Sequence, residues 1–223
     1  MGSRFGFGGA LAAVLFVVQA GAAPAALRTF SNPAAFAFGG TTTSSTIAIA
    51  GVAGNLIDAQ VRLNGAGVQF YVNGLEETEF LLVSPSGEEI VLMSFACNAT
   101  AGPVTLQFSS TGSLLPNGLP ASPSCVSGTF QPSDFHSFAV GGAYILDAPP
   151  APPAPYPGTL ANLVGDSRNG TWTLYAEEFG GNETGVLAAG WDLILLLPDE
   201  ADLAVSQTAV PAQIPPGGSA TFT

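Results

Sequence analysis

Lysine is absent from this sequence of 223 residues, and its four basic residues are Arg4, Arg28, Arg62 and Arg168. Sixteen acidic residues outweigh them and give a formal net charge of −12 at pH 7. Nucleic acids and anionic membrane surfaces are bound through clusters of basic side chains, which this composition does not supply. We therefore expect no nucleic acid partner, and we expect most carboxylates simply to hydrate the surface.

Histidine is nearly absent as well, because His136 is the only one. A serine-protease triad needs a histidine between a serine and a carboxylate. His136 lies in a Pro-rich stretch with no strand pattern, where we expect an exposed loop residue. The sequence thus indicates no catalytic residues and no enzymatic activity of this chain.

Cysteine occurs twice, at Cys97 and Cys125. Two thiolates and one distant histidine cannot supply the four ligands of a zinc site. In an oxidising compartment the two are expected to form a disulfide, which would contribute about 3–4 kcal/mol for a loop of this length. Two separate buried thiols are the alternative. The disulfide would tether residues 110–160, a patternless stretch that includes the Pro-rich run 149–155 and is long for a compact domain unless it is functional or wraps the surface.

No amphipathic helix of useful length is visible, whereas alternation with a period of two is frequent. Ile57–Leu63 and Val104–Ser109 alternate apolar and polar residues, which is typical of strands with one buried face. Ile90–Met93 is apolar throughout and favours a strand inside a sheet. The predicted class is therefore all-β. The expected strands are Thr46–Ala50, Ile57–Leu63, Gly67–Val72, Glu79–Val83, Glu89–Ser94, Val104–Ser109, Thr171–Glu177 and Trp191–Leu197.

The amino terminus has the three parts of a secretory signal peptide. These are a basic start at Arg4, an apolar run over Ala10–Val18 and the small-residue motif Ala20-Gly21-Ala22. The apolar run is shorter than the roughly 20 residues that span a bilayer. We expect residues 1–22 to be removed and the product to be secreted, extracellular or periplasmic, without membrane insertion. An uncleaved anchor is the alternative.

Gly165–Leu197 is the most informative stretch. It contains the strands Thr171–Glu177 and Trp191–Leu197, each with one tryptophan, separated by an acidic, Gly-rich loop. We interpret it as the core hairpin of a β-sandwich. Trp172 and Trp191 are expected to pack in the core, and a platform for a sugar is the alternative.

The loop between these two strands concentrates oxygen ligands of the kind that calcium prefers. The candidate calcium ligands are Glu177, Glu178, Asn182 and Glu183, with Glu77 or Glu79 approaching across the sheet. We favour an acidic turn without an ion, and a calcium site is the alternative. Calcium is the one cofactor that the sequence suggests.

Several segments resemble, in order, the P domain (homo B domain) that follows the catalytic domain of subtilisin-like proprotein convertases. They are Ile57–Leu63, the Glu77–Gly87 segment ETEFLLVSPSG, Ile90–Ser94, the Ser127–Pro132 segment SGTFQP, the Asn169–Tyr175 segment NGTWTLY and the Gly190–Leu193 segment GWDL. The resemblance covers about residues 45–197 and implies a jelly-roll β-sandwich of about eight strands. The chain departs from the family in its acidic positions, where Glu77-x-Glu79 and Glu177-Glu178 replace the usual aspartates.

The remaining segments are assigned around that domain. Residues 23–44 are expected to be a lead-in whose three phenylalanines pack on the sandwich, namely Phe30, Phe36 and Phe38. Residues 198–223 are expected to hold a linker and the truncated start of an Ig-like repeat, because Ala201–Val205 and Pro216-Gly217-Gly218 resemble the start of such repeats in bacterial surface proteins.

The resemblance implies a secreted, non-catalytic accessory or adhesion module of a larger bacterial surface or exported protein. Its partners would be other domains of the same or a larger polypeptide. In convertases such a domain stabilises the neighbouring subtilisin-like domain, so association with a serine endopeptidase is the alternative. A carbohydrate-binding β-sandwich is a second alternative, based on the fold alone.

Overall fold

The computed structural model describes residues 25–69, 75–97, 103–118, 123–138, 142–146, 148–179 and 184–198. The expected signal peptide and all of the expected linker and Ig-like start except Pro198 lie outside these residues.

The described chain is an all-β sandwich, as the sequence predicts, with twelve strands in its described residues. This number exceeds the eight strands expected, partly because β1 and β2 lie in the expected lead-in, whereas the expected strands Ile57–Leu63 and Gly67–Val72 fall on one strand, β4, as far as the structure describes them. The strands are β1 (Ala25–Asn32), β2 (Phe36–Phe38), β3 (Thr43–Ile49), β4 (Asp58–Gln69), β5 (Thr78–Val83), β6 (Glu89–Ser94), β7 (Val104–Ser113), β8 (Gly128–Phe130), β9 (Ser133–Asp134), β10 (Gly170–Glu178), β11 (Thr184–Leu187) and β12 (Trp191–Pro198). Short 3-10 helices are η1 (Leu75–Glu77), η2 (His136–Phe138) and η3 (Leu160–Leu163).

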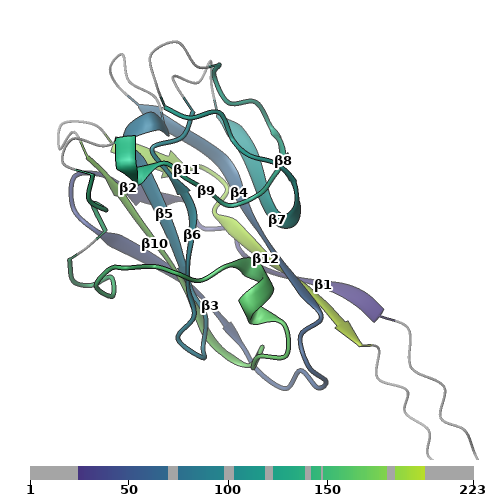
Figure 1. Ribbon diagram of the computed structural model, residues 1–223. Coiled ribbons are helices and arrows are strands. Elements are labelled where there is room, and N and C mark those ends of the chain that lie inside the picture. Colours follow the sequence, from purple (N-terminus) through teal and green to yellow (C-terminus); the bar gives the residue numbers. More distant parts are fainter. Residues whose placement is uncertain are drawn as a thin grey trace, which may run out of the picture.

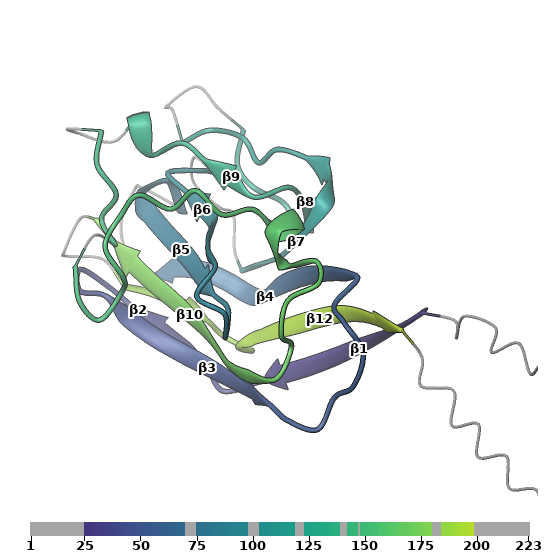
Figure 2. The same cartoon turned by 60° about the horizontal axis from the view of Figure 1, so that its bottom comes forward.

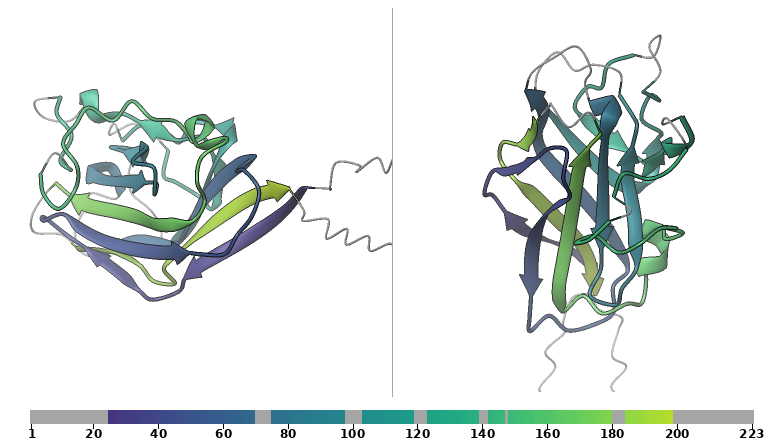
Figure 3. Two further views of the ribbon diagram at one scale, coloured as in Figure 1. Left: turned by 90° about the horizontal axis from the view of Figure 1, so that it is seen from below. Right: turned by 90° about the vertical axis from the view of Figure 1, so that its left-hand side faces the viewer.

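Two curved sheets face each other across the core (Figure 1). The seven-stranded sheet has the order β1-β12-β4-β11-β2, with β7 pairing β4 and β8 pairing β7. The five-stranded sheet has the order β3-β10-β5-β6-β9. The pairs β6–β9 and β7–β8 are parallel, and the other pairs are antiparallel. Figure 3 shows the two layers from below.

The strands begin at Ala25, inside the segment expected to be a lead-in. β1 pairs with β12 along its whole length, and Phe30 lies opposite Leu193. Phe36 and Phe38 of β2 are buried in the main core, as expected for residues that pack on the sandwich. The alternation of β1 is hard to see in the sequence because this strand lies at an edge, where even Leu27 is 61% exposed.

The expected Trp172–Trp191 hairpin is wrong. β10 belongs to the five-stranded sheet and β12 to the seven-stranded sheet, with β11 between them in sequence. Both indole rings are nevertheless fully buried in the main core. The indole N–H of Trp172 donates to the Arg168 carbonyl at 3.1 Å, and that of Trp191 donates to Ser45 Oγ at 3.0 Å. Such burial leaves no ring face open to a sugar.

Residues 144–146 and 148–156, which include the Pro-rich run, pack against the outer face of the five-stranded sheet and are called the covering segment below. A second apolar cluster joins Leu81 of β5 and Val91 of β6 to Leu146, Ala151 and Tyr156 of the segment. Figure 2 shows this green segment passing over β5, β6 and β10. This covering segment explains why Ile90–Met93 is apolar on both faces.

Cys97 and Cys125 form a disulfide between residues 28 positions apart in the sequence, which confirms the predicted pair.

Candidate functional site

The two described members of the predicted calcium group lie on opposite faces of β10. Glu177 lies on the outer face, where its carboxylate accepts a hydrogen bond from the Thr42 hydroxyl. Glu178 is fully buried on the inner face, in line with Trp172. Successive side chains of a strand point to opposite sides, so the two carboxylates diverge.

Asn182 and Glu183, the other two predicted ligands, lie outside the described residues. Within the described ranges, no group of three or more His, Cys, Asp or Glu side chains is placed to hold a metal ion. The described residues therefore do not test the calcium hypothesis, which needs titration of the protein with calcium.

A row of polar side chains instead crosses the outer face of the five-stranded sheet. Glu177 of β10 lies opposite Glu79 of β5, which lies opposite Ser94 of β6, which lies opposite Asp134 of β9. Residues that are register partners project from the same face of a sheet. Three carboxyl groups from distant parts of the sequence therefore share one line across the surface.

Glu79 is the buried member of this row, with 1% of its surface exposed. Its Oε1 accepts a hydrogen bond from the Ser94 hydroxyl at 2.7 Å. Its Oε2 accepts from the backbone N–H groups of Ile145 and Leu146 at 2.9 and 3.1 Å. Glu79 thus anchors the covering segment to the sheet through one side chain.

Burial raises the pKa of Glu79 above its ordinary value, because desolvation disfavours the charged form more than these hydrogen bonds favour it. The negative charge of Asp134 adds to the increase. Burial also raises the pKa of Glu177, with the nearby Glu178 carboxylate contributing in the same direction.

His136 is not the exposed loop residue that the sequence predicts. It begins η2, and its Nδ1 lies 2.8 Å from Oδ1 of Asp134. Tyr144 donates its hydroxyl to Oδ2 of the same carboxylate at 2.7 Å, and the His136 and Tyr144 rings stack with centroids 4.0 Å apart. Burial, followed by the hydrogen bond to Asp134, raises the pKa of Tyr144.

The Asp134–His136–Tyr144 cluster orients an imidazole as a triad does, with a carboxylate at Nδ1. Among the described residues, no serine hydroxyl is hydrogen-bonded to this ring. The sequence gives no signal for the cluster, because Tyr144 reaches it only through the course of the covering segment.

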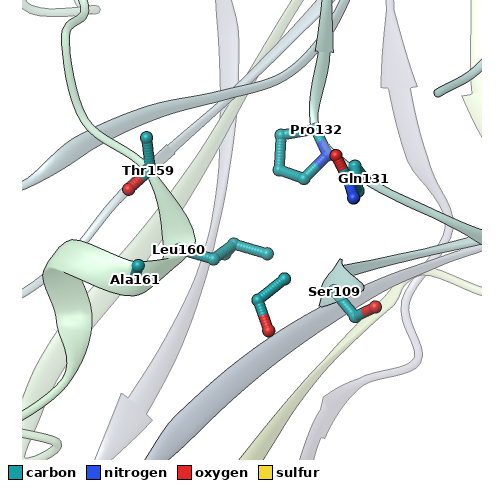
Figure 4. Close-up of a pocket in the computed structure, with 7 residues that line it drawn as sticks. Ser109, Gln131, Pro132, Thr159, Leu160 and Ala161 are labelled. Atoms are coloured by element: carbon teal, nitrogen blue, oxygen red, sulfur yellow. The ribbon is translucent and has the colours of Figure 1, made fainter. Parts of the chain in front are cut away.

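A shallow pocket of about 210 Å³ opens elsewhere on the molecule, where three segments meet (Figure 4). Its lining residues carry no charge and are Ser109, Ser110, Gln131, Pro132, Thr159, Leu160 and Ala161. They come from β7, from the connection between β8 and β9, and from the start of η3. The sequence did not indicate this pocket, because its parts lie about fifty residues apart end to end.

Two glycines of the P-domain-like segments are required by close packing. Gly170 has a φ of 129°, and a Cβ at this position would lie 2.6 Å from Cβ of Pro85 in the turn after β5. Gly190 has a φ of 65°, and a Cβ there would lie 1.9 Å from the Asn32 carbonyl oxygen. A side chain at Gly170 would push the start of β10 away from the turn after β5, and one at Gly190 would push the turn before β12 away from the end of β1.

No protein-family model matches this chain, and no curated protein matches it. Among solved structures it is similar to a serine protease of Aeromonas sobria, with 17% identity over 78% of this chain and 26% of that chain, and a TM-score of 0.37. It is also similar to the Aeromonas sobria serine protease in complex with its chaperone, with 15% identity over 79% of this chain and 27% of that chain, and a TM-score of 0.36. The chain spans about a quarter of the length of each matched chain. No helix in the described residues is long and apolar enough to cross a membrane.

Proposed function

We propose that this chain is a non-catalytic, P-domain-like accessory module of an exported protein. The observation that carries the proposal is the closed sandwich whose two described ends are register partners, with Ala25 opposite Pro198. Adjacent ends are typical of domains that attach to or insert between others without disturbing their own core. The partners would be neighbouring domains of the same or a larger polypeptide.

The placement of the P-domain-like segments supports the proposal. They fall on β4, β5, β6, β8, β10 and β12, so each contributes to the sandwich. Two of their glycines, Gly170 and Gly190, occupy positions where only glycine fits. Both glycines allow close contacts between strands and turns of the sandwich, which suits a module that supports a neighbour.

An activity assay tests the non-catalytic part of the proposal. The purified full chain is incubated with a fluorescent protein substrate, and the variant His136→Ala is run beside it. We expect no cleavage above buffer by either protein, because the described imidazole has an orienting carboxylate but no hydroxyl partner. Cleavage by the wild-type chain that disappears in the His136→Ala variant would overturn the proposal.

Export is tested by mass spectrometry of the protein recovered from cells and from the medium. We expect the protein outside the cytoplasm to begin at Ala23, with the Cys97–Cys125 disulfide formed. A protein that stays in the cytoplasm with reduced cysteines would contradict the exported part of the proposal, independently of the activity assay.

A further inference from the structure

We infer that the pocket between β7, the β8–β9 connection and η3 binds a neutral, hydroxyl-bearing ligand of the size of one sugar ring. The accessory role proposed above assigns no ligand, so this inference goes beyond it and can fail alone.

The walls of the pocket are held in place before any ligand arrives. The Gln131 backbone N–H donates to the Ser113 carbonyl at 2.9 Å, and the Gln131 carbonyl accepts from the Ser133 hydroxyl at 2.8 Å. On the opposite wall, both the backbone N–H and the hydroxyl of Thr159 donate to Oδ1 of Asn162, at 2.8 and 2.7 Å. Preformed walls are usual in small-molecule sites, because the ligand need not order them.

The pocket offers unused hydrogen-bonding groups. In the described part of the chain, neither the side-chain amide of Gln131 nor the hydroxyl of Ser110 has a hydrogen-bond partner. The Ser109 hydroxyl is taken up by Thr111, since it donates to the Thr111 carbonyl and accepts the Thr111 backbone N–H. The Thr159 hydroxyl donates to Asn162, and its oxygen can accept from a ligand. The site therefore presents both donors and acceptors, as a hydroxyl-rich ligand requires.

The rest of the lining is apolar. Figure 4 shows the Leu160 side chain extending between Thr159 on one side and Pro132 with Gln131 on the other. Leu160 is 2% exposed, so it forms a firm base rather than a mobile flap. A sugar ring has an apolar face of C–H groups and an edge of hydroxyls, and the accessible apolar surface of the pocket comes from Pro132 and Ala161 rather than from the buried Leu160.

The charge and the volume of the pocket limit further which ligands it can bind. No lining residue is charged, so an ionic ligand would lose water without gaining a counter-charge. A volume of about 210 Å³ holds roughly seven waters at ~30 Å³ each. It is smaller than the roughly 300 Å³ at which pockets for drug-sized ligands begin. One ring fills it, and we expect a dissociation constant in the millimolar range.

The test titrates the full chain with single sugars, followed by saturation-transfer NMR. Glucose, galactose, mannose and N-acetylglucosamine are the neutral probes, while glucuronic acid and glucosamine are the charged controls. We expect at least one neutral sugar to bind and both charged sugars to bind at least tenfold more weakly. The inference is overturned if no neutral sugar binds even at concentrations well above millimolar. It is also overturned if glucuronic acid binds as tightly as the neutral sugars.

Variants locate the binding. Gln131→Ala removes the free amide and should weaken binding at least tenfold, whereas Thr129→Ala, at an exposed position of β8 outside the lining, should leave it unchanged. Ser110→Trp at the exposed rim fills the space and should abolish binding with the thermal midpoint preserved. Binding that survives both Gln131→Ala and Ser110→Trp in folded protein would place the ligand elsewhere and overturn the inference.

Discussion

Glu79 should make the fold more stable in mild acid than at neutral pH. The variants Glu79→Gln and Glu79→Ala separate the titration of its carboxyl group from the hydrogen bonds that its oxygens accept. The buried carboxylate is faced by Glu177 on β10, Asp134 on β9 and Tyr144 in the covering segment. Its pKa is raised in the folded state, chiefly by burial. Because its pKa is higher in the folded state, the Glu79 carboxylate binds a proton more tightly in the native than in the unfolded chain.

The sign of the pH effect follows from this shift. The stabilisation is complete below the ordinary pKa of a glutamate, and it is lost as the pH rises through the higher folded pKa of Glu79. A protonated carboxyl group can satisfy the same neighbours, because Oε1–H donates to Ser94 while Oε2 still accepts from Ile145 and Leu146. The neutral acid is therefore the form that this site suits.

The size of the effect differs between the two variants. In Glu79→Ala, the N–H groups of Ile145 and Leu146 lose their acceptor, which costs about 1–3 kcal/mol for each group. The free energy of unfolding should therefore fall by roughly 2–6 kcal/mol. In Glu79→Gln, the amide oxygen can accept both N–H groups, and the amide N–H can donate to Ser94. This variant should be at least as stable as the wild type at pH 7 and less dependent on pH.

Urea unfolding followed by tryptophan fluorescence measures these differences, because Trp172 and Trp191 are fully buried in the native core. The free energy of unfolding is compared between pH 5 and pH 8 for all three proteins. Glu177 lies opposite Glu79 and its pKa is also raised, so all three proteins are also measured with Glu177→Gln, where the differences report Glu79. The reasoning is refuted if Glu79→Gln loses as much stability as Glu79→Ala at pH 7, or if its pH dependence equals that of the wild type.

Three further predictions concern the disulfide, one glycine and calcium. Replacing Cys97 and Cys125 together by alanine should lower the free energy of unfolding by about 3–4 kcal/mol, measured in urea, since the loop spans 28 residues; a loss near zero would contradict the assigned tether. Gly190→Ala should cost clearly more than Gly51→Ala, which has a similar positive φ but no atom within 4 Å and should lose only about 1–2 kcal/mol; equal thermal shifts would contradict the packing argument. Millimolar calcium should not raise the thermal midpoint, because the carboxylates at the start of the 177–185 loop diverge; a clear rise with heat of binding in calorimetry would contradict this expectation.

The strands that the sequence predicts best are those with one buried face. Ile57–Leu63 alternates clearly because Ala59, Val61 and Leu63 enter the core while Asp58 and Arg62 stay on the outer face, although Ile57 lies just before β4 and is 42% exposed. β1 has no such contrast, since it is an edge strand with solvent on most of its surface. A strand buried on one face shows alternation and a strand buried on both faces shows an apolar run, whereas the mostly exposed β1 shows neither pattern.

Asn64-Gly65 shows how local signals mislead. The sequence there predicts the end of one strand and the start of another at Gly67. β4 instead continues through it, with an irregular register against β7 between Leu63 and Ala66. Gly65 has a φ of 66°, and the pair exchanges backbone hydrogen bonds with Ala188, Ala189 and Gly190 in the turn between β11 and β12. The glycine makes a bulge rather than a turn, because neighbouring strands on both sides hold β4 in the sheet.

The candidate sites escape prediction for a different reason. Asp134 and Tyr144 meet Glu79 only because a segment without strand pattern folds over the five-stranded sheet. The pocket likewise joins residues near positions 110, 131 and 160. Sequence patterns report which face of an element is buried, whereas these sites depend on which surface a loop covers.

The pairing of β1 with β12 has a mechanical consequence. Ala25 and Pro198 face each other at one end of a ladder of eight residue pairs. Tension between the two chain ends would open this ladder as a zipper, one pair after another, instead of shearing all its hydrogen bonds together. β1 would peel away at low force, while β12 stays held by β4 on its other edge. A module built this way would yield in a small first step under pull and keep the rest of its core.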